Sequence, residues 1–317
     1  MNASLRGGSF WTRLFLCGTI LAGTAGFAPH ASAKTPHPAA RSLSCAAEPR
    51  PGFADADDDG NISGLAVDLC RAVAIATLGP DATIHFALPQ SEQEFAALAR
   101  GRVDLAFLSD EALDTHHLRG AEIVGPTVFI DPLSVMVPAD SPAQHPADLA
   151  GQVVCVMIGT PAHRALMAAT EGLTPPLAPS SYSEDVEMLD GYNIGNCKAA
   201  AEADSRLVEM QHDSGVRHLK SKILTPPLGL LPIRAAAPAA HAALAFAVLE
   251  DLTSTPKHET RWDGATPAIP GLRATWRADV AKALGSYADM RTRHLGPDAP
   301  IWPNAAWPDG LLMPRPR

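Results

Sequence analysis

The stretch from Gly52 to Phe107 constrains the fold of this chain more than any other part of the sequence. It starts with a strand-like segment and an acidic turn at 57–61, rich in the Asp, Asn and Gly residues that tight turns favour. Apolar residues then recur at nearly every fourth position from Leu65 to Ala76. This spacing predicts an amphipathic helix.

A second helix and a further strand are expected in the same stretch. Ser91 and Glu94 have the spacing of a capping box, which predicts a helix that starts at Ser91 and ends at Gly101. Apolar residues alternate from Val103 to Phe107, as they do in a strand. This order of strands and helices predicts an α/β unit with a mostly parallel sheet.

The length of the chain allows two such units. It has 317 residues, and a domain typically takes roughly 100–200 residues. Charged residues make up 19% of the chain, which argues against disorder of the whole. The net charge of −9, with no basic stripe, argues against a nucleic-acid partner.

The N-terminus has the pattern of a signal peptide. Two arginines precede the apolar run Leu14–Ala22, and the small residues Ala31–Ala33 follow it. The alternative is an uncleaved anchor, but this run is short for a membrane span. We therefore expect residues 1–33 to be a cleaved signal peptide and 34–40 a disordered leader. The product would be exported to the periplasm.

The same stretch, GF followed by DDDGN, GL, VD and CRAVA, and the later RVDL, resembles the periplasmic solute-binding proteins of the amino-acid family. These are soluble receptors of ABC importers, and the resemblance is strongest to the long general L-amino-acid-binding branch. It extends from about residue 41 to the end. It implies a type II periplasmic-binding-protein fold with two lobes, each a mostly parallel sheet flanked by helices, and a ligand cleft between them.

The resemblance also implies a domain division that is discontinuous in sequence. Lobe 1 would take residues 41–132 and 228–317, and lobe 2 residues 133–227. Asp131-Pro132 is the expected hinge, because proline fixes φ and ends ladder pairing. The return crossing is expected within Ile223–Ile233.

Further elements are expected in the second lobe and after it. Thr160 followed by proline predicts a helix start, with the helix running to about Glu171. Residues 198–204 look helical, although the family has a strand there. Long helices are expected at 235–252 and 277–295.

Four cysteines remain once Cys17, in the signal segment, is set aside. They allow three pairings, and export favours disulfides over free thiols. Pairing within each lobe gives Cys45–Cys70 and Cys155–Cys197. The alternative is four buried thiols, and no spacing typical of a metal site is present.

The resemblance places the ligand's carboxylate at the turn Gly159-Thr160. Backbone N–H groups at a helix N-terminus suit an anion. The proline at 161 has no N–H, so Ala162 and His163 would donate. An ordinary capped helix is the alternative.

The family also holds that carboxylate with an arginine of lobe 1, through two parallel hydrogen bonds. Thr115, His116 and His117 stand at the expected place, and the nearest arginine is Arg119. A histidine is mostly neutral near pH 7 and cannot form this fork. Either Arg119 takes the role, or the ligand is not a standard amino acid and Arg119 is a solvated surface residue. We expect ordinary α-amino acids to bind weakly or not at all.

Polar residues that would accept the ligand's amine are expected on both lobes. Ser109, Asp110 and Glu111 occupy this position in lobe 1. Their carboxylates would suit a cation or a dicationic amine. In lobe 2 the expected aspartate falls beside Glu202 and Asp204. We take Asp204 as the candidate.

No metal site, cofactor or catalytic site is expected. Clustered charges around His116 are more often solvated than metal-bound. Asp55–Gly60 resembles the start of a calcium-binding loop, but position 66, where such a loop needs a glutamate, holds alanine. No nucleophile or metalloprotease motif is present in the sequence.

We therefore expect a monomeric periplasmic receptor of an amino-acid-type ABC importer. It would bind a small polar solute by hinge closure and then dock on a membrane permease. The alternative is a receptor-like accessory or sensor protein that has lost amino-acid binding and contacts another periplasmic protein.

Overall fold

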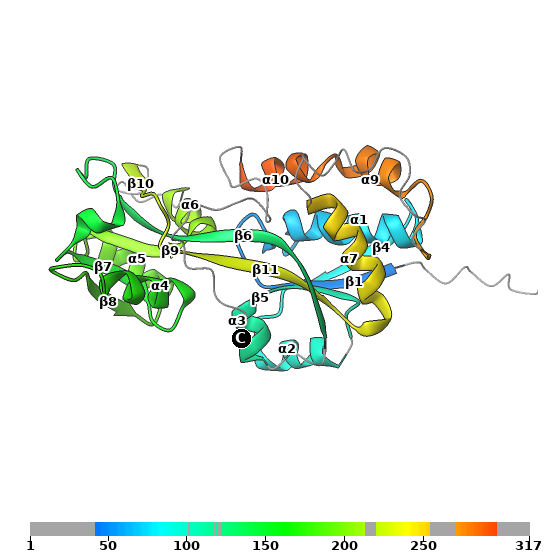
Figure 1. Ribbon diagram of the computed structural model, residues 1–317, viewed down its shortest axis with the longest axis horizontal. Helices are drawn as coiled ribbons and strands as arrows, with labels where there is room; N and C mark the ends of the chain where they lie inside the picture. The colour runs from blue at the N-terminus through cyan, green and yellow to red at the C-terminus, as the bar shows by residue number, and fades with distance from the viewer. Residues whose placement is uncertain are drawn as a thin grey trace, which may run out of the picture. The chain divides into compact units, whose positions relative to one another are not determined.

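The structure is a computed structural model, shown in Figure 1. It describes residues 42–100, 102–116, 118, 122–212, 220–253 and 270–296. The elements, in chain order, are β1 (Ser42–Ala47), β2 (Asp55–Ala56), β3 (Ile62–Ser63), α1 (Leu65–Leu78), β4 (Thr83–Ala87), α2 (Glu92–Ala99), β5 (Leu105–Ser109), α3 (Asp110–Thr115), β6 (Ile123–Pro138), η1 (Pro146–Leu149), β7 (Val153–Met157), α4 (Pro161–Thr170), β8 (Ala178–Tyr182), α5 (Asp185–Asn193), β9 (Ala199–Ala203), α6 (Asp204–His212), β10 (Ser221–Ile223), β11 (Gly229–Ala237), α7 (Ala239–Thr253), α9 (Trp276–Leu284) and α10 (Tyr287–Leu295).

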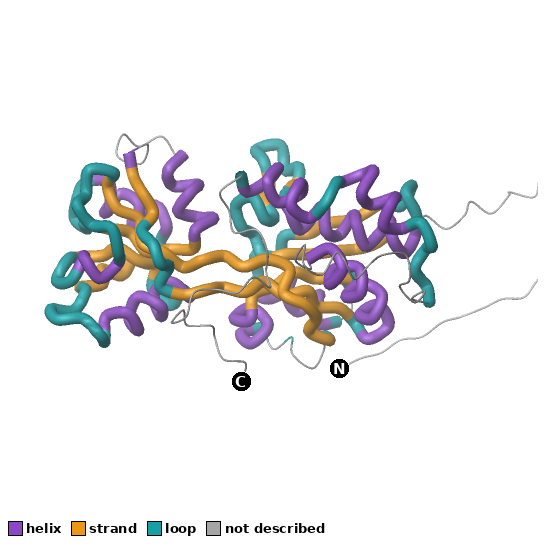
Figure 2. Tube along the Cα trace, turned by 45° about the horizontal axis from the view of Figure 1, so that its top comes forward, coloured by secondary structure: helices purple, strands orange, loops and turns teal. Residues whose placement is uncertain are grey.

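The main sheet has the strand order β4-β1-β5-β11-β6-β9-β7-β8, with β10 paired to β6. We call β4, β1 and β5 the first half and β9, β7 and β8 the second half; within each half the strands are parallel. The long strands β6 and β11 are antiparallel to each other and join the halves, as Figures 1 and 2 show. The chain therefore crosses between the halves along these two strands.

The first half confirms the elements expected from Gly52 to Phe107. Helix α1 packs its apolar face onto the sheet, and Leu65, Leu69 and Phe107 are fully buried. Helix α2 has the predicted cap, in which Ser91 and Glu94 each bond the other's backbone N–H. The disulfide Cys45–Cys70, one of the predicted pairs, ties β1 to α1.

The acidic turn closes a short antiparallel hairpin of β2 and β3. Asp57 Oδ1 accepts hydrogen bonds from the backbone N–H groups of Asp59 and Asn61 at 3.1 and 2.8 Å. These bonds to the exposed Asp57 lower the pKa of its carboxyl group, the side-chain bond from Asn61 contributing most. The carboxylate stabilises the turn itself, as the hairpin interpretation requires.

The second half corrects one expectation. Residues 199–203 form strand β9, not a helix. Their alanines favour helix in isolation, but the segment lies between β6 and β7, where Ala199, Ala200 and Ala201 are fully buried. Pairing on both edges outweighs the local preference. The predicted disulfide Cys155–Cys197 is also present here.

The expected break at Pro132 is absent from the described strand, because β6 runs through it without interruption. The carbonyl of Leu133 accepts the N–H of Leu228, on the β11 side. Neighbouring residues of a strand direct their amides to opposite edges, so the Pro132 nitrogen faces away from β11. Pairing with β9 begins only at Leu133, and the missing N–H therefore costs no ladder bond.

Two expected helices have different bounds. Residues 235–237 end strand β11, and α7 starts only at Ala239. The helix expected at 277–295 is two helices, α9 and α10, separated at Gly285. Gly285 has φ 83°, a left-handed conformation that favours glycine, and Ser286 then starts α10 with its own capping box.

The expectations for the N-terminal segment and for Arg119 lie outside the described residues. Within the described part of the chain, none of the helices has the length and apolar character needed to cross a membrane.

Candidate functional site

The candidate site is a cavity of about 400 Å³ between the two halves of the sheet. Its lining comes from segments at the carboxyl ends of β1, β5, β7 and β9. In open α/β sheets, ligands bind outside the carboxyl ends of the strands. Leu133 and Leu231, from the crossing strands β6 and β11, add apolar surface.

The wall from the first half is rich in charge. Glu48 and Arg50 follow β1, while Ser109 and Glu111 lie where β5 passes into α3. The carboxylate of Glu48 accepts the backbone N–H of Ser109. The Ser109 hydroxyl in turn accepts the N–H of Ala112 at 3.1 Å and so caps α3. The ends of β1 and β5 are thus held together by one carboxylate.

Arg50 is held by an ion pair with Asp131 of β6, 2.8 Å from Nη1 to Oδ2. The Asp131 side chain is only 1% exposed and also accepts both the hydroxyl and the backbone N–H of Ser205. Burial alone would lower the pKa of Arg50, but the charges of Asp131 and Glu48 outweigh it and raise that pKa. Asp131 therefore links the first wall to the start of α6, beside the second.

The wall from the second half is mainly backbone and apolar surface, contributed by the turn Ile158–Pro161. The Thr160 hydroxyl accepts the N–H of His163 at 3.2 Å and donates to the carbonyl of Met157 at 2.9 Å. The N–H of Gly159 donates to the ring of His163 at 3.4 Å. The protein's own side chains thus bond two of the amides at this helix start.

Two carboxylates stand at the end of β9. Glu202 lines the cavity, and burial is the largest cause of its raised pKa. Asp204 begins α6, and burial raises its pKa to about 7 despite a hydrogen bond with Ser134. Its Oδ1 is buried with no partner among the described residues. Both groups are costly to keep charged without a cation nearby.

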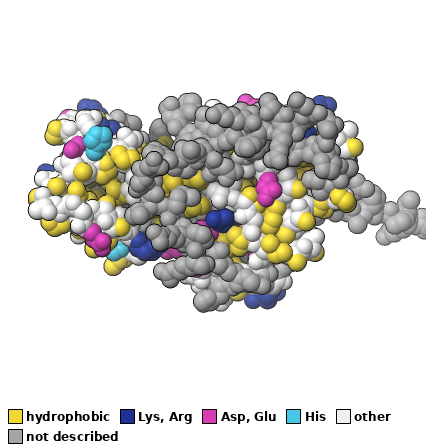
Figure 3. All heavy atoms as spheres, in the orientation of Figure 1, with side chains coloured by type: hydrophobic (Ala, Val, Ile, Leu, Met, Phe, Trp, Pro, Cys, Tyr) yellow, Lys and Arg dark blue, Asp and Glu magenta, His cyan; other side chains and the backbone are white. Residues whose placement is uncertain are grey.

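An ion pair crosses the edge of the cavity. Arg164 of α4 donates to Glu111 of α3 at 2.6 Å and to the carbonyl of Gly159 at 2.8 Å. The Arg164 side chain is 56% exposed, so solvent screens this pair. In Figure 3, acidic and basic side chains lie beside one another near the lower middle of the visible face.

The structure divides the candidate ligand residues into two groups. Ser109, Glu111, Gly159 and Thr160 line the cavity. The others are not part of its lining: Asp110 pairs with Arg234 at 3.0 Å, His116 stacks on Phe95 with ring centroids 3.7 Å apart, Ala162 is buried in α4, Asp204 starts α6, and Arg119 is outside the described residues.

Sequence reasoning missed Glu48 and Arg50 as cavity residues, and gave Glu202 only a neighbouring role. A usable signal was present, because Glu48 and Arg50 directly follow the apolar end of β1. Residues at the carboxyl end of a parallel strand are positioned for binding.

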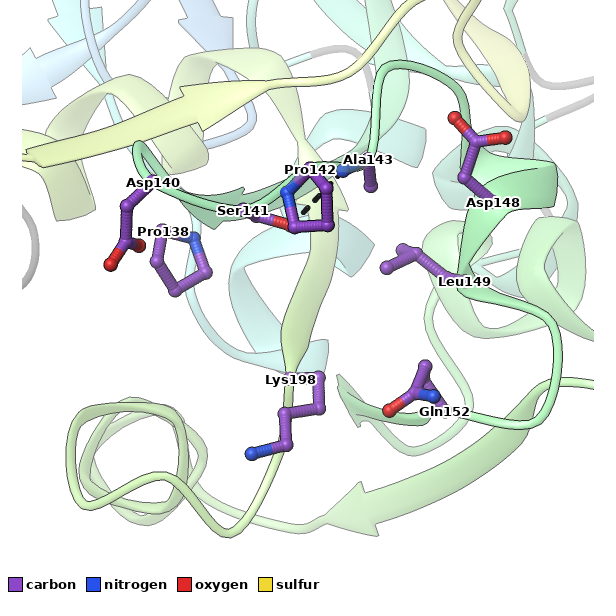
Figure 4. A pocket seen from close by; sticks show the side chains of 9 residues that line it. All are labelled: Pro138, Asp140, Ser141, Pro142, Ala143, Asp148, Leu149, Gln152 and Lys198. Atoms are coloured by element: carbon purple, nitrogen blue, oxygen red, sulfur yellow. Dashed lines mark hydrogen bonds between the residues drawn. The ribbon is translucent and has the colours of Figure 1, made fainter.

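A second cavity, of about 500 Å³, lies at the other ends of the strands. Figure 4 shows its lining, which includes Gln152 just before β7, Lys198 just before β9, and Asp140 and Asp148 from the segment after β6. Despite its larger volume, it draws only on β6 and the second half of the sheet. The smaller cavity is the better candidate, because both halves of the sheet build it.

Comparison with known proteins gives the family context. No family model matches the chain. YhdW of Escherichia coli K12 is described as an amino-acid ABC transporter-binding protein. It is 23% identical to this chain over 277 residues, which cover 79% of this chain and 80% of YhdW. AapJ of Rhizobium johnstonii, a general L-amino acid-binding periplasmic protein, is 22% identical over 292 residues, 83% of this chain and 85% of its own.

The homologues of this chain are amino-acid ABC transporter-binding proteins. A solved periplasmic binding protein from Brucella ovis, with glutathione bound, has a TM-score of 0.62 and 21% identity, covering 82% of this chain and 90% of that one. The extracellular-binding protein ytmK of Bacillus subtilis has a TM-score of 0.55 and 16% identity, covering 77% and 97%. The predicted two-lobed α/β fold is confirmed.

Proposed function

We propose that this protein is the solute-binding receptor of an amino-acid-type ABC importer. The observation that carries the proposal is the cavity to which both halves of the sheet contribute the carboxyl ends of their strands. A small polar solute in this cavity would contact Glu48, Arg50 and Ser109 on one wall and Gly159 and Thr160 on the other.

The mechanism follows from this two-sided lining. A solute that touches both walls stabilises the closed arrangement, because it makes more contacts there than when the walls are apart. The lobes would be residues 41–132 with 228–317, and 133–227, connected through β6 and β11. The strands run through the crossing, so bending would be spread along them rather than concentrated at Pro132.

The partners of the receptor follow from the names of its homologues, which are binding proteins of ABC transporters. The closed form would dock on the membrane permease of an importer. Residues 1–33 would direct export to the periplasm and be cleaved, and the mature receptor would act as a monomer. The homologues favour this receptor role over the accessory role, and they favour binding over catalysis.

Thermal unfolding and calorimetry of the mature protein, against amino acids, oligopeptides and aliphatic amines, test this function. A ligand at 100 times its Kd should stabilise the protein by about 2.7 kcal/mol and raise the Tm accordingly. Saturable one-to-one binding that is lost when Thr160 is replaced by a bulky Trp supports the proposal. Absence of binding across all three classes would contradict it.

A further inference from the structure

The charges on the cavity lining do not cancel. Among the described residues that line it, the carboxylates are those of Glu48, Glu111 and Glu202, and the one guanidinium is that of Arg50. Arg50 is already paired with Asp131, and Glu111 with an arginine at the edge of the cavity. Within the described part of the chain, Glu48 and Glu202 are left without an ion-pair partner.

These two carboxylates come from opposite walls. Glu48 follows β1 of the first half, and Glu202 belongs to β9 of the second. Apolar surface from Leu133, Ile158 and Leu231 also lines the cavity. The lining thus combines a carboxylate on each wall with surface that suits an aliphatic chain.

We propose that the ligand is a small aliphatic molecule with two cationic nitrogen groups, one held by Glu48 and one by Glu202. The proposal rests on the receptor function and adds the class of solute to it. Each ammonium or guanidinium group would donate charge-assisted hydrogen bonds to a carboxylate that has no ion-pair partner among the described residues. A ligand held this way bridges both walls and so favours closure.

The same lining disfavours other solutes. An acidic ligand would bring negative charge to a cavity with a surplus of carboxylates. A neutral zwitterion would offer only one cation, and the guanidinium of Arg50 is already engaged by Asp131. The Nε atom of Arg50 is buried and has no partner among the described residues.

Two sources share the required chemistry, basic amino acids and aliphatic diamines. Calorimetry should therefore compare lysine and ornithine with cadaverine and putrescine. The matched controls are norleucine, which lacks only the second amine of lysine, and pentylamine, which lacks one amine of cadaverine. Glutamate serves as the anionic control. Dications should bind at least 30-fold more tightly than their matched controls.

The variants Glu202→Gln and Glu48→Gln test the assignment of the two groups. Each should weaken binding of the best dication at least tenfold and reduce its advantage over the singly charged control. Glu250→Gln removes an exposed carboxylate of α7 outside the cavity and should leave affinity unchanged. Glu202→Asp, which keeps the charge, should retain more affinity than the amide variant, and circular dichroism verifies folding.

The outcomes separate this inference from the receptor function. Tight binding of norleucine or glutamate, equal to that of lysine, would overturn the dication inference and leave the receptor function standing. Binding of lysine that is unchanged in both amide variants would also overturn it. Lack of binding by any solute, in this panel and in the broader one, would overturn both proposals.

Discussion

The two walls of the cavity are built alike but differ in chemistry. Each is formed at the carboxyl ends of parallel strands, and each half of the sheet carries one disulfide. The first wall presents Glu48, Arg50 and Glu111, three charged side chains. The second presents the turn Ile158–Pro161 and a single charged group, Glu202.

This difference indicates a division of roles between the walls. In the proposed receptor, the first wall, with its Arg50–Asp131 ion pair, would recognise charge. The second wall would supply shape and one opposing carboxylate. A solute would then have to satisfy both walls to close the molecule, so specificity would depend on the spacing of its charges as well as on their sign.

The disulfides test whether the two halves are stabilised to a similar extent. Replacing both cysteines of a pair by serine should lower the free energy of unfolding by about 3.5 kcal/mol for Cys45–Cys70 and about 4 kcal/mol for Cys155–Cys197. The second loss is larger because the cysteines are 42 residues apart rather than 25. Urea unfolding of the two double variants measures both values. A negligible loss of unfolding free energy in either double variant would contradict the expectation that the two disulfides stabilise their halves to a similar extent.

The ion pair of the first wall should matter more than the one at the edge of the cavity. Arg50→Met leaves Asp131 buried without its cation, which we expect to cost about 3 kcal/mol. Arg164→Met removes the exposed partner of Glu111 and should cost about 0–1 kcal/mol. Denaturant unfolding compares the two variants. Equal losses of unfolding free energy would contradict the expectation that the buried pair of the first wall matters more than the exposed pair.

A pH titration compares two buried carboxyl groups from different parts of the sheet. Glu122 lies just before β6, and Asp204 follows β9. Burial raises the pKa of each to about 7, from ordinary values of 4.5 and 3.8. At these two groups the folded state holds more protons than the unfolded state. Their contribution to the unfolding free energy is therefore fully present below about pH 4 and is lost as the pH rises through 7.

Each amide variant should flatten that decline. Glu122→Gln and Asp204→Asn each remove one titrating group. The unfolding free energy of each variant should therefore fall less between pH 4 and pH 8 than that of the unchanged protein. Chemical unfolding at several pH values measures the slope. A slope that is unchanged in both variants would show that neither carboxyl titrates in this range.

The smallest expected effect concerns helix starts in the two regions. Thr160→Ala in α4 and Ser286→Ala in α10 each remove a side-chain cap, which typically costs about 1 kcal/mol. Only Thr160 lines the cavity, so only its variant should also change ligand affinity. Unfolding and calorimetry on the same samples compare them, and a loss of affinity in Ser286→Ala would break the distinction.

Local signals predicted the first half of the fold well. The capping box of Ser91 and Glu94 and the acidic turn at Asp57 depend on neighbours within a few residues, and both formed as expected. The errors arose where distant pairing decides. Ala199–Ala203 is a strand because β6 and β7 flank it. Pro132 is tolerated in β6 because its nitrogen points to the edge of the strand that has no partner at this residue.

The site was predicted less completely, for the same reason. The turn at Gly159 and the residues Ser109 and Glu111 were identified from the resemblance to the solute-binding family, and all of them line the cavity. Arg50 was missed because its role depends on Asp131, which is far along the chain but only 2.8 Å away in space. The sequence alone does not show which arginine meets which carboxylate.

A crystal structure of the protein with its tightest-binding solute tests the central claim most directly. We predict density for the ligand between Glu48 and Arg50 on one side and Gly159 and Glu202 on the other, with contacts to both walls. Density instead in the cavity beside Lys198, or contacts with one half of the sheet alone, would contradict the account.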